Sequence, residues 1–522
     1  MSDEPAQGSL VSLEALPTDV PWQRLDSRMI GAALTRMLVM VAPVAFAWVI
    51  LGQRDSSSSW TFVALTAVAV VVPCFYMLRY VRFRYRITVT ELQITSGLLV
   101  RRVRRVPLHR IRTVDITAKP ILRLFSLAIV TIGTGQQVAA GDSGLQLDAV
   151  RAPIAASLRA DLLAAAGKAA ERTESMAAVA GTDCNLTKTS PPTVLRIRWA
   201  WMLYAIVGVW SVAAPTVIFG SVYQGMQFLG RSPDTYVGWY FSEYLDRVSW
   251  GLWLLTTGGC FVVVGVIGAA AVFVESWWNY TLVHEQGGRF VATRGLLTTR
   301  SFTVDQSRLR GVTVAEALTT RALRGARLVP ILTGVSADQQ NKDSGVLVPT
   351  TTRDIPVSLA NTLLGETVLT ADRLAPGWLH RHPPAALRRI LFRYQAAAVV
   401  LAAGLVAAWW WWDWPISLVA IPVVAGALLV PAALGNYRGL GHRVADGYLF
   451  SRRGYFLRRF DAVQLRGVSG AAVRQSVLQR RLGLASVIAT TASGEKAYYV
   501  VDVGIDAATE LASALGGREF VS

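Results

Sequence analysis

Apolar residues along this chain gather in six long runs, and the stretches between the runs alternate apolar with polar positions. Each run has about 18 to 25 residues, the length that a helix needs to cross a hydrocarbon core of about 30 Å. Tryptophans stand at several run ends, where their amphipathic rings favour the membrane interface. We therefore predict six transmembrane helices in three hairpin pairs, at Ile30 to Leu51, Trp60 to Leu78, Trp199 to Val222, Trp250 to Val274, Tyr394 to Trp412 and Trp414 to Leu434.

The soluble stretches predict a β-rich domain after each pair of spans. Each stretch ends in an amphipathic segment of helix-forming composition, at Pro153 to Ala166, Pro356 to Val368 and Ile505 to Leu515. The predicted fold class is thus an α+β membrane protein. Its predicted limits are 1–29 for an N-terminal tail, 30–78, 199–274 and 394–434 for the transmembrane pairs, 79–170, 275–370 and 435–522 for the soluble domains, and 171–198 and 371–393 for linkers.

A repeat links the three soluble domains. Each copy begins with a strand, a turn glycine and a second strand, and the glycine accepts the positive φ of a hairpin turn. From that glycine each copy runs 26 residues to an arginine in a turn-plus-leucine motif. The repeat-motif residues are Gly97 with Arg123, Gly295 with Arg321, and Gly454 with Arg480. A unit of one span pair and one β-rich domain therefore occurs three times.

Basic residues lie on one side of every predicted span pair. The loops inside the pairs are poor in Lys and Arg, whereas arginines flank the outer ends, among them Arg79, Arg196 and Arg388. Residues 1–29 contain five acidic residues and no apolar core, unlike a signal peptide. By the positive-inside rule, both termini and all soluble domains are predicted to be cytoplasmic.

Two segments resemble a motif of the bacterial pleckstrin-homology-like (PH-like) family that is close to Ser-Pro-Leu-Gln-Arg-x-Leu-Gly-Leu. They are Lys119 to Leu127 and Ser476 to Leu484, and the Arg-rich stretch Arg101 to Val106 precedes the first. The middle copy, Ala317 to Gly325, retains little beyond Arg321 and its spacing. The repeated span pairs are similar to the long, three-domain members of the membrane-tethered branch.

The resemblance implies a fold and a location. Each soluble domain would be a seven-stranded, partly open β-barrel capped by its C-terminal helix, in a protein of the bacterial plasma membrane. A smaller single-domain membrane relative is implied as a partner. A shared fold does not transfer a ligand, so the resemblance names none.

Candidate catalytic and metal-binding chemistry is sparse. His380 and His382 have the spacing of a metal-binding pair, but they stand in a Pro-rich linker without nearby Cys or a carboxylate cluster. The sequence has neither a Gly-rich phosphate loop nor a nucleophile elbow. We therefore expect no enzyme activity, no catalytic residue, no metal and no cofactor.

Composition supports the membrane assignment and bears on the partner. Hydrophobic residues make up 52% of the 522 residues and charged residues 16%, which is too apolar for an ordinary soluble protein of this size. The net charge of +18 suits an anionic leaflet or nucleic acid, yet only 5 of the 52 basic residues are Lys. That Arg bias is typical of a GC-rich genome, so we expect no nucleic-acid partner.

The remaining candidate site is basic surface beside the bilayer, where each arginine adds about 1 kcal/mol of attraction to anionic lipid. The predicted lipid- or partner-binding residues are Arg101, Arg102, Arg104, Arg105, Arg110, Arg112, Arg458 and Arg459. Two functions stay open: a scaffold that binds lipid head groups or proteins at the inner leaflet, or a lipid or solute path through the spans that the domains regulate. The same arginines also fit a solvated strand face or a role in topology alone.

Overall fold

The structure is a computed structural model that divides into two compact units. It describes residues 22–24, 26–38, 83–88, 91–96, 102–107, 113–133, 145–151, 153–155, 192–228, 232–240, 247–285, 288–333, 346–375, 377–412, 415–491 and 497–516, together with the single residues 67, 71, 78 and 243.

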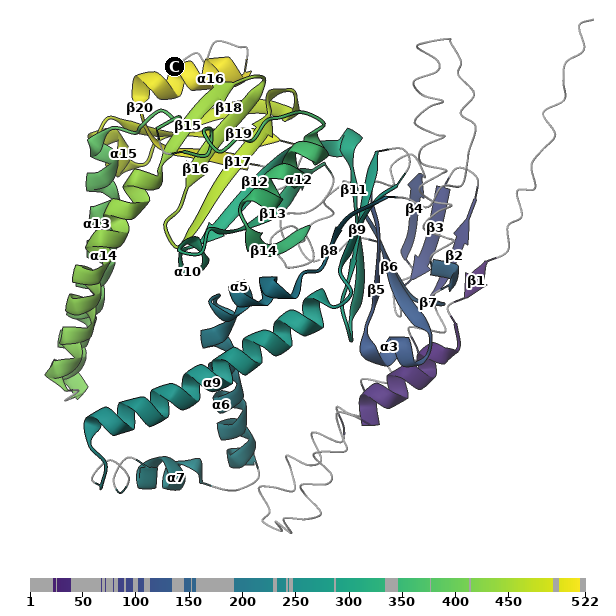
Figure 1. Cartoon of the computed structure of the whole chain (residues 1–522), viewed down its shortest axis with the longest axis horizontal. Coiled ribbons are helices and arrows are strands. Elements are labelled where there is room, and N and C mark those ends of the chain that lie inside the picture. The colour runs from purple at the N-terminus through teal and green to yellow at the C-terminus, as the bar shows by residue number, and fades with distance from the viewer. Residues whose placement is uncertain are drawn as a thin grey trace, which may run out of the picture. The chain divides into compact units, whose positions relative to one another are not determined.

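 The first unit comprises Met1–Arg112, Pro120–Val130 and Gln146–Thr182, and the second comprises Thr113–Lys119, Thr131–Leu145 and Asp183–Ser522. Each unit mixes helices with antiparallel sheets, so the predicted α+β class is confirmed (Figure 1).

Three helices of the described chain are long and apolar enough to cross a membrane. They are Gly251–Trp277, Pro384–Trp411 and Ile416–Gly439, and a fourth span results if the bent pair Trp199–Ile206 and Trp210–Gln227 is counted as one. Most of the first two predicted spans lies outside the described residues. Membrane association is therefore supported, and the full set of six spans stays a prediction.

The second transmembrane pair contains a bend that the sequence pattern did not predict. Its elements are η2 (Trp199–Trp201), α5 (Met202–Ile206), α6 (Trp210–Phe228), α7 (Pro233–Trp239) and α9 (Trp250–Trp277). The chain turns by 67° between α5 and α6, at a break that contains Gly208. Glycines let α6 and α9 approach closely, because a Cβ on Gly265 would lie 2.2 Å from the carbonyl oxygen of Ser211.

The third transmembrane pair consists of α13 (Pro384–Trp412), η6 (Ile416–Val419) and α14 (Ala420–Gly439). Helix α13 begins well before the predicted span, because Pro384 suits a first helical turn and the next turns have a core to pack against. Ala386 and Ile390 of α13 share a buried cluster with Ala433 of α14 and Leu484 of the third copy. The soluble copy and its span pair are therefore packed together.

Each copy contains an early hairpin and a later three-stranded part. The first copy has β1 (Gln23–Arg24), β2 (Arg84–Ile87), β3 (Glu91–Ser96), β4 (Arg102–Pro107), β5 (Thr113–Ala118), α3 (Pro120–Leu124), β6 (Leu127–Gly133) and β7 (Leu145–Arg151). The second has β8 (Thr193–Arg196), β9 (Thr281–Glu285), β10 (Arg289–Arg294), β11 (Thr299–Asp305), η4 (Gln306–Arg308), β12 (Leu309–Ala317), α10 (Leu318–Arg321), β13 (Gly325–Leu332), β14 (Val348–Thr352) and α12 (Asp354–Leu364). The third has β15 (Gly441–Ala445), β16 (Tyr448–Arg453), β17 (Leu457–Gln464), η7 (Leu465–Gly467), β18 (Val468–Arg474), α15 (Val477–Arg481), β19 (Leu484–Thr491), β20 (Ala497–Gly504) and α16 (Ile505–Gly516).

The chain ahead of each span pair contributes to the sheet that follows it. Gln23 pairs with Tyr85, Thr193 with Val283, and His380 forms an isolated bridge with His442. Tyr85, Val283 and His442 all lie 12 residues before the turn glycine of their copy. In each copy, therefore, the segment that contains the predicted span pair follows the first strand-forming residues of the soluble domain. This arrangement gives the first two copies seven described strands each, as the resemblance implied, whereas a barrel arrangement stays a prediction.

Strand pairing also joins one copy to the next. In the second unit, β5 of the first copy pairs with β11 of the second, and β12 of the second pairs with β17 of the third. The second of these junctions creates one sheet in the order β14-β13-β12-β17-β16-β15 (Figure 1). The predicted domain limits therefore separate segments that share a sheet.

The predicted closing helices are observed in the second and third copies. Helix α12 buries Leu359, Ala360 and Leu363 in the core of the second copy, and α16 buries Leu511 and Ala512 in the core of the third. In the first copy, most of the predicted segment lies outside the described residues.

The turn glycines have the conformation that the repeat predicted. Gly295 has a φ of +112° and Gly454 a φ of +91°, and Gly97 lies outside the described residues. A Cβ would approach the carbonyl oxygen of Thr298 to 2.0 Å in the second copy and that of Leu457 to 2.2 Å in the third. Glycine is required at both turns because any side chain would collide with the backbone.

Candidate functional site

The best-preserved repeat motif, Ser476 to Leu484, forms the start of a buried polar network. Ser476 caps α15, since its hydroxyl accepts the backbone N–H of Gln479 while the Gln479 side chain accepts the N–H of Ser476. Gly483 then adopts a φ of +65°, and Leu484 is fully buried at the start of β19. Ser476, Gln479, Gly483 and Leu484 thus have structural roles, and Arg480 is exposed.

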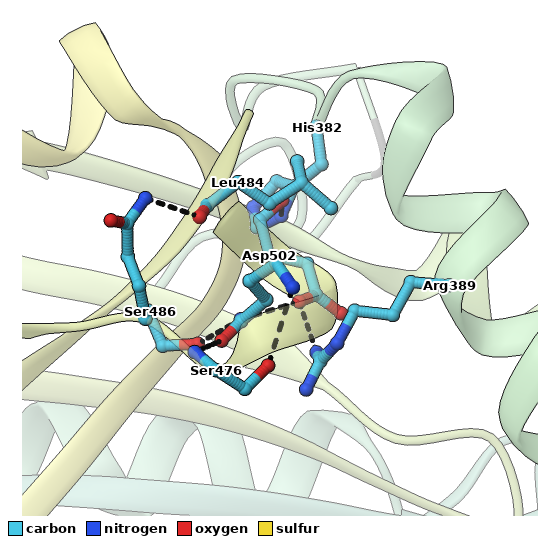
Figure 2. A network of polar contacts seen from close by, with 8 residues as sticks. His382, Arg389, Ser476, Leu484, Ser486 and Asp502 are labelled. Carbon is cyan, nitrogen blue, oxygen red and sulfur yellow. Dashed lines mark hydrogen bonds and ion pairs between the residues drawn. The ribbon is translucent and has the colours of Figure 1, made fainter. Parts of the chain in front are cut away.

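Asp502 on β20 connects this motif to the transmembrane helix α13 (Figure 2). Its buried carboxylate accepts a hydrogen bond of 2.8 Å from the Gln479 amide and forms an ion pair with Arg389 of α13. The Gln479 amide donates a second bond of 2.7 Å to Ser486. A buried carboxylate needs such partners, because an unpaired charge there is strongly destabilising.

Two buried histidines extend the network on the other side of Asp502. Nδ1 of His382 donates to the carbonyl oxygen of Asp502 at 3.1 Å, because a carbonyl oxygen can only accept. Nε2 of His382 is then free to accept from Nδ1 of His442, at 3.1 Å. Burial lowers the pKa of His382, and burial together with the neighbouring histidines lowers the pKa of His442 to about 4. Both rings are therefore neutral at pH 7.

These histidines form a structural linkage and have no metal-binding geometry. Within the ranges that the structure describes, no three His, Cys, Asp or Glu side chains converge as metal ligands would. His380 contributes through its backbone, which pairs with that of His442.

The glycine turn of the third copy lies along α14. A Cβ on Gly435 would collide with the Tyr455 ring, and Tyr455 and Phe456 line an open apolar cavity of about 430 Å³ with Leu428 and Pro431 of α14. All three of these α14 positions belong to the candidate span, so the turn reaches past the helix end toward its apolar stretch. Phe456 remains 56% exposed beside it.

Arg452 secures the end of the same helix. Its Nε donates to the carbonyl oxygen of Gly439, the last residue of α14, at 2.8 Å. A cation at this end also interacts favourably with the helix dipole. Burial, with a further contribution from Arg458, lowers the pKa of Arg452 to about 10, so the guanidinium keeps its charge at neutral pH.

The second copy repeats this docking against its own span. The backbone N–H groups of Gly295 and Leu296 donate to the carbonyl oxygens of Trp278 and Glu275, at the end of α9. Leu297, the counterpart of Phe456, is 55% exposed. In both copies, therefore, an apolar turn lies at the C-terminal end of a helix that is long and apolar enough to cross a membrane.

Exposed arginines surround this end of the third span pair. Arg388 and Arg393 on α13 and Arg438 on α14 have exposed side chains, whereas tryptophans 409–412 lie at the opposite end of α13. The sequence analysis identified Arg388 as a topology-setting residue only. Asp502, Gln479 and His442 were not identified as interacting residues, although the position of Gln479 in the repeat motif was a usable signal.

The predicted lipid-binding arginines are distributed differently. Arg102, Arg104 and Arg105 lie on β4, where Arg105 is exposed, whereas Arg101, Arg110 and Arg112 lie outside the described residues. Arg458 and Arg459 are half-buried on β17, opposite Glu316 and Ala315 of β12. The two groups belong to different compact units, β4 to the first and β17 to the second, and lipid binding by either stays a prediction.

The repeated arginines occupy equivalent short helices. Arg123 lies in α3, Arg321 in α10 and Arg480 in α15. Arg321 donates to the carbonyl oxygen of Tyr455 at 2.7 Å, so this position contacts the next copy along the chain.

A comparison with protein families identifies the third and first copies. The family model described as the bacterial PH domain matches residues 36–166 and 383–519, slightly more than half of the chain. No curated protein and no solved structure matches the chain. The matched ranges include a predicted span pair together with the soluble copy that follows it.

Proposed function

Because the chain belongs to the bacterial PH domain family, we propose that it is a non-enzymatic, membrane-anchored scaffold that binds anionic lipid head groups at the inner leaflet of the bacterial plasma membrane. The soluble copies would face the cytoplasm, on the basic side of the spans. Binding would occur where the glycine turn of the third copy adjoins α14.

The observation that carries this proposal is the position of the turn beside the span. Phe456 is exposed next to the apolar stretch of α14, so lipid chains are its expected surroundings. Arg438 follows Gly435 by less than one helical turn, and Arg388 lies in the part of α13 that packs on the end of α14. An apolar tip with adjacent cations matches an anionic lipid, which has a buried chain and a phosphate at the interface.

The polar network supports a scaffold because it fixes the domain to the membrane helix. Asp502 of β20 is buried and pairs with the partly buried Arg389 of α13, and His382, which bonds to His442, contacts the Asp502 backbone. Such a linkage holds the exposed arginines in place relative to the turn. It does not by itself identify the lipid.

The test is retention of anionic lipid by the full-length protein. The wild-type chain and a variant with Arg388→Gln, Arg393→Gln and Arg438→Gln would be placed in nanodiscs containing phosphatidylglycerol and phosphatidylcholine, and bound lipid would be measured by native mass spectrometry after detergent extraction. At about 1 kcal/mol for each arginine, the variant should retain phosphatidylglycerol more than tenfold less well.

A matched control removes the same charge at the other end of the strands. Arg289 is the first residue of β10, Arg310 is the second residue of β12, and Arg466 lies just beyond the end of β17, so all three are at strand ends remote from the glycine turns. Their substitution by Gln should leave lipid retention unchanged. Equal retention by wild type and the first variant, or no preference of wild type for the anionic lipid, would contradict lipid recognition here and favour a protein partner.

A further inference from the structure

The third copy contains a strand, β18, with one unpaired edge. In the sheet β18-β19-β20, the described part of the chain pairs β18 with β19 on one side and places no strand on the other. The equivalent strands of the first two copies, β5 and β12, both pair with the third strand of the following copy. Within the described residues, β18 lacks this pairing.

The first copy has the complementary open edge. β4 is the third strand of the first copy, equivalent to β11 and β17, and within the described residues it pairs with β3 alone. Val103 on β4 is 48% exposed. One chain therefore carries both halves of the junction that it uses internally between its copies.

Both internal junctions have the same register. Counted from the turn glycine of each copy, position 21 (Ala118) pairs with position 4 (Thr299) at the first junction. At the second, position 16 (Gly311) pairs with position 9 (Val463), so the two positions total 25 in both cases. Applied to the open edges, this register places Gly470 opposite Val106 and Val473 opposite Val103.

Gly470 is a glycine at the position where the second copy needs one to accommodate a neighbouring strand. Its counterpart in the second copy, Gly311, follows a β-bulge, and a Cβ there would lie 2.1 Å from the carbonyl oxygen of Ala462 in the adjoining copy. β18 has its bulge at the same place, yet a Cβ on Gly470 would meet only the Thr490 hydroxyl, at 3.4 Å. Within the described structure, Gly470 therefore has room for a side chain.

The short helix that follows β18 also exposes residues whose counterparts contact the adjoining copy. In the second copy, the N–H of Leu318 and the guanidinium of Arg321 donate to the carbonyl oxygens of Phe456 and Tyr455 in the adjoining copy. The equivalent residues of the third copy are Val477, which is 75% exposed, and Arg480, which is also exposed.

We propose that the edge formed by β18 and α15 binds β4 of a second copy of this chain, in the register of the internal junctions. Because the two edges differ, the contact is head to tail and generates a ring or an extended row in the plane of the membrane. Long unpaired edges are usually protected, and the bulge on β18 is not sufficient protection, because β12 has the same bulge and still pairs.

Charge opposes this contact in one place. The register puts Arg474 of β18 opposite Arg102 of β4, and like charges directly opposite one another weaken a strand pair. Association should therefore increase with salt, and Arg474→Glu should increase it at low salt.

The test uses two differently tagged full-length chains, one with Val473→Cys and one with Val103→Cys, in a background that lacks Cys74, Cys184 and Cys260. After co-reconstitution and mild oxidation, a disulfide should join the two tags. A control pair with Thr509→Cys on α16 in place of the residue-473 variant should show at least tenfold less cross-linking, because Thr509 is exposed on a helix and has no place in the proposed strand register.

A second variant separates pairing from folding. Gly470→Ala should abolish the cross-link while leaving the unfolding temperature unchanged, whereas Gly504→Ala, which also has free space, should change neither. No cross-link between correctly folded chains, or equal cross-linking by the Thr509 control, would overturn the proposal.

Discussion

At the residue scale, a buried carboxylate fixes the third PH-like domain to its membrane helix. Asp502 has a φ of +60°, a conformation that few residues with side chains adopt, and its carboxylate contacts both Arg389 and Gln479. A left-handed aspartate in this position implies that the contacts outweigh the backbone strain.

Removing this carboxylate should destabilise the protein more than removing an exposed one. Asp502→Ala leaves Arg389 buried without its partner, so we expect a loss of about 3 to 5 kcal/mol in the free energy of unfolding. Asp506→Ala, at an exposed position on α16, is the control and should change it by less than about 0.5 kcal/mol. Thermal unfolding of the purified full-length variants measures both. Equal shifts would show that the network contributes little.

The histidine pair predicts a loss of stability in mild acid. The folded protein holds the pKa of His442 at about 4, below the ordinary value of 6.5, so the unfolded chain binds more protons between these values. Stability therefore falls as the pH drops from about 6.5 toward 4, by up to about 1.4 kcal/mol for each pH unit. His442→Gln cannot titrate and should flatten this dependence in unfolding temperatures measured from pH 7 to 5. An identical pH dependence in wild type and variant would contradict the assignment.

At the element scale, glycine turns dock the strands onto the ends of the spans. Their position was predictable, since a glycine at constant spacing in three copies marks a turn that needs positive φ. The contact with α14 was not predictable, because the sequence does not tell which helix face Tyr455 and Phe456 meet.

Two glycines of the third copy should differ in their tolerance to alanine. Gly483 has a positive φ but free space around it, so Gly483→Ala should cost about 1 kcal/mol. Gly454→Ala adds a collision with the carbonyl oxygen of Leu457 and should cost clearly more. Thermal unfolding compares the two variants, and a cost at Gly454 no larger than that at Gly483 would contradict the turn geometry.

At the scale of the whole molecule, the sequence predicted the order of the parts better than their connections. The lengths of the hydrophobic runs predicted the positions of α9, α13 and α14. The alternation of apolar and polar residues between the runs predicted the β-rich copies. Strand pairing between copies, as of β12 with β17, depends on edges that no local pattern specifies. The first strand of each copy was missed because β1 and β8 are short and lie before the spans.

The proposed function requires the soluble copies to lie at the inner leaflet, and cysteine labelling in intact cells tests this most directly. In a background without the native cysteines, Thr509→Cys on α16 and Tyr236→Cys on α7, both at exposed positions, would be treated with a membrane-impermeant maleimide. We predict that residue 236 is labelled in intact cells and residue 509 only after lysis. Labelling of residue 509 in intact cells would place the third PH-like domain outside and contradict the account.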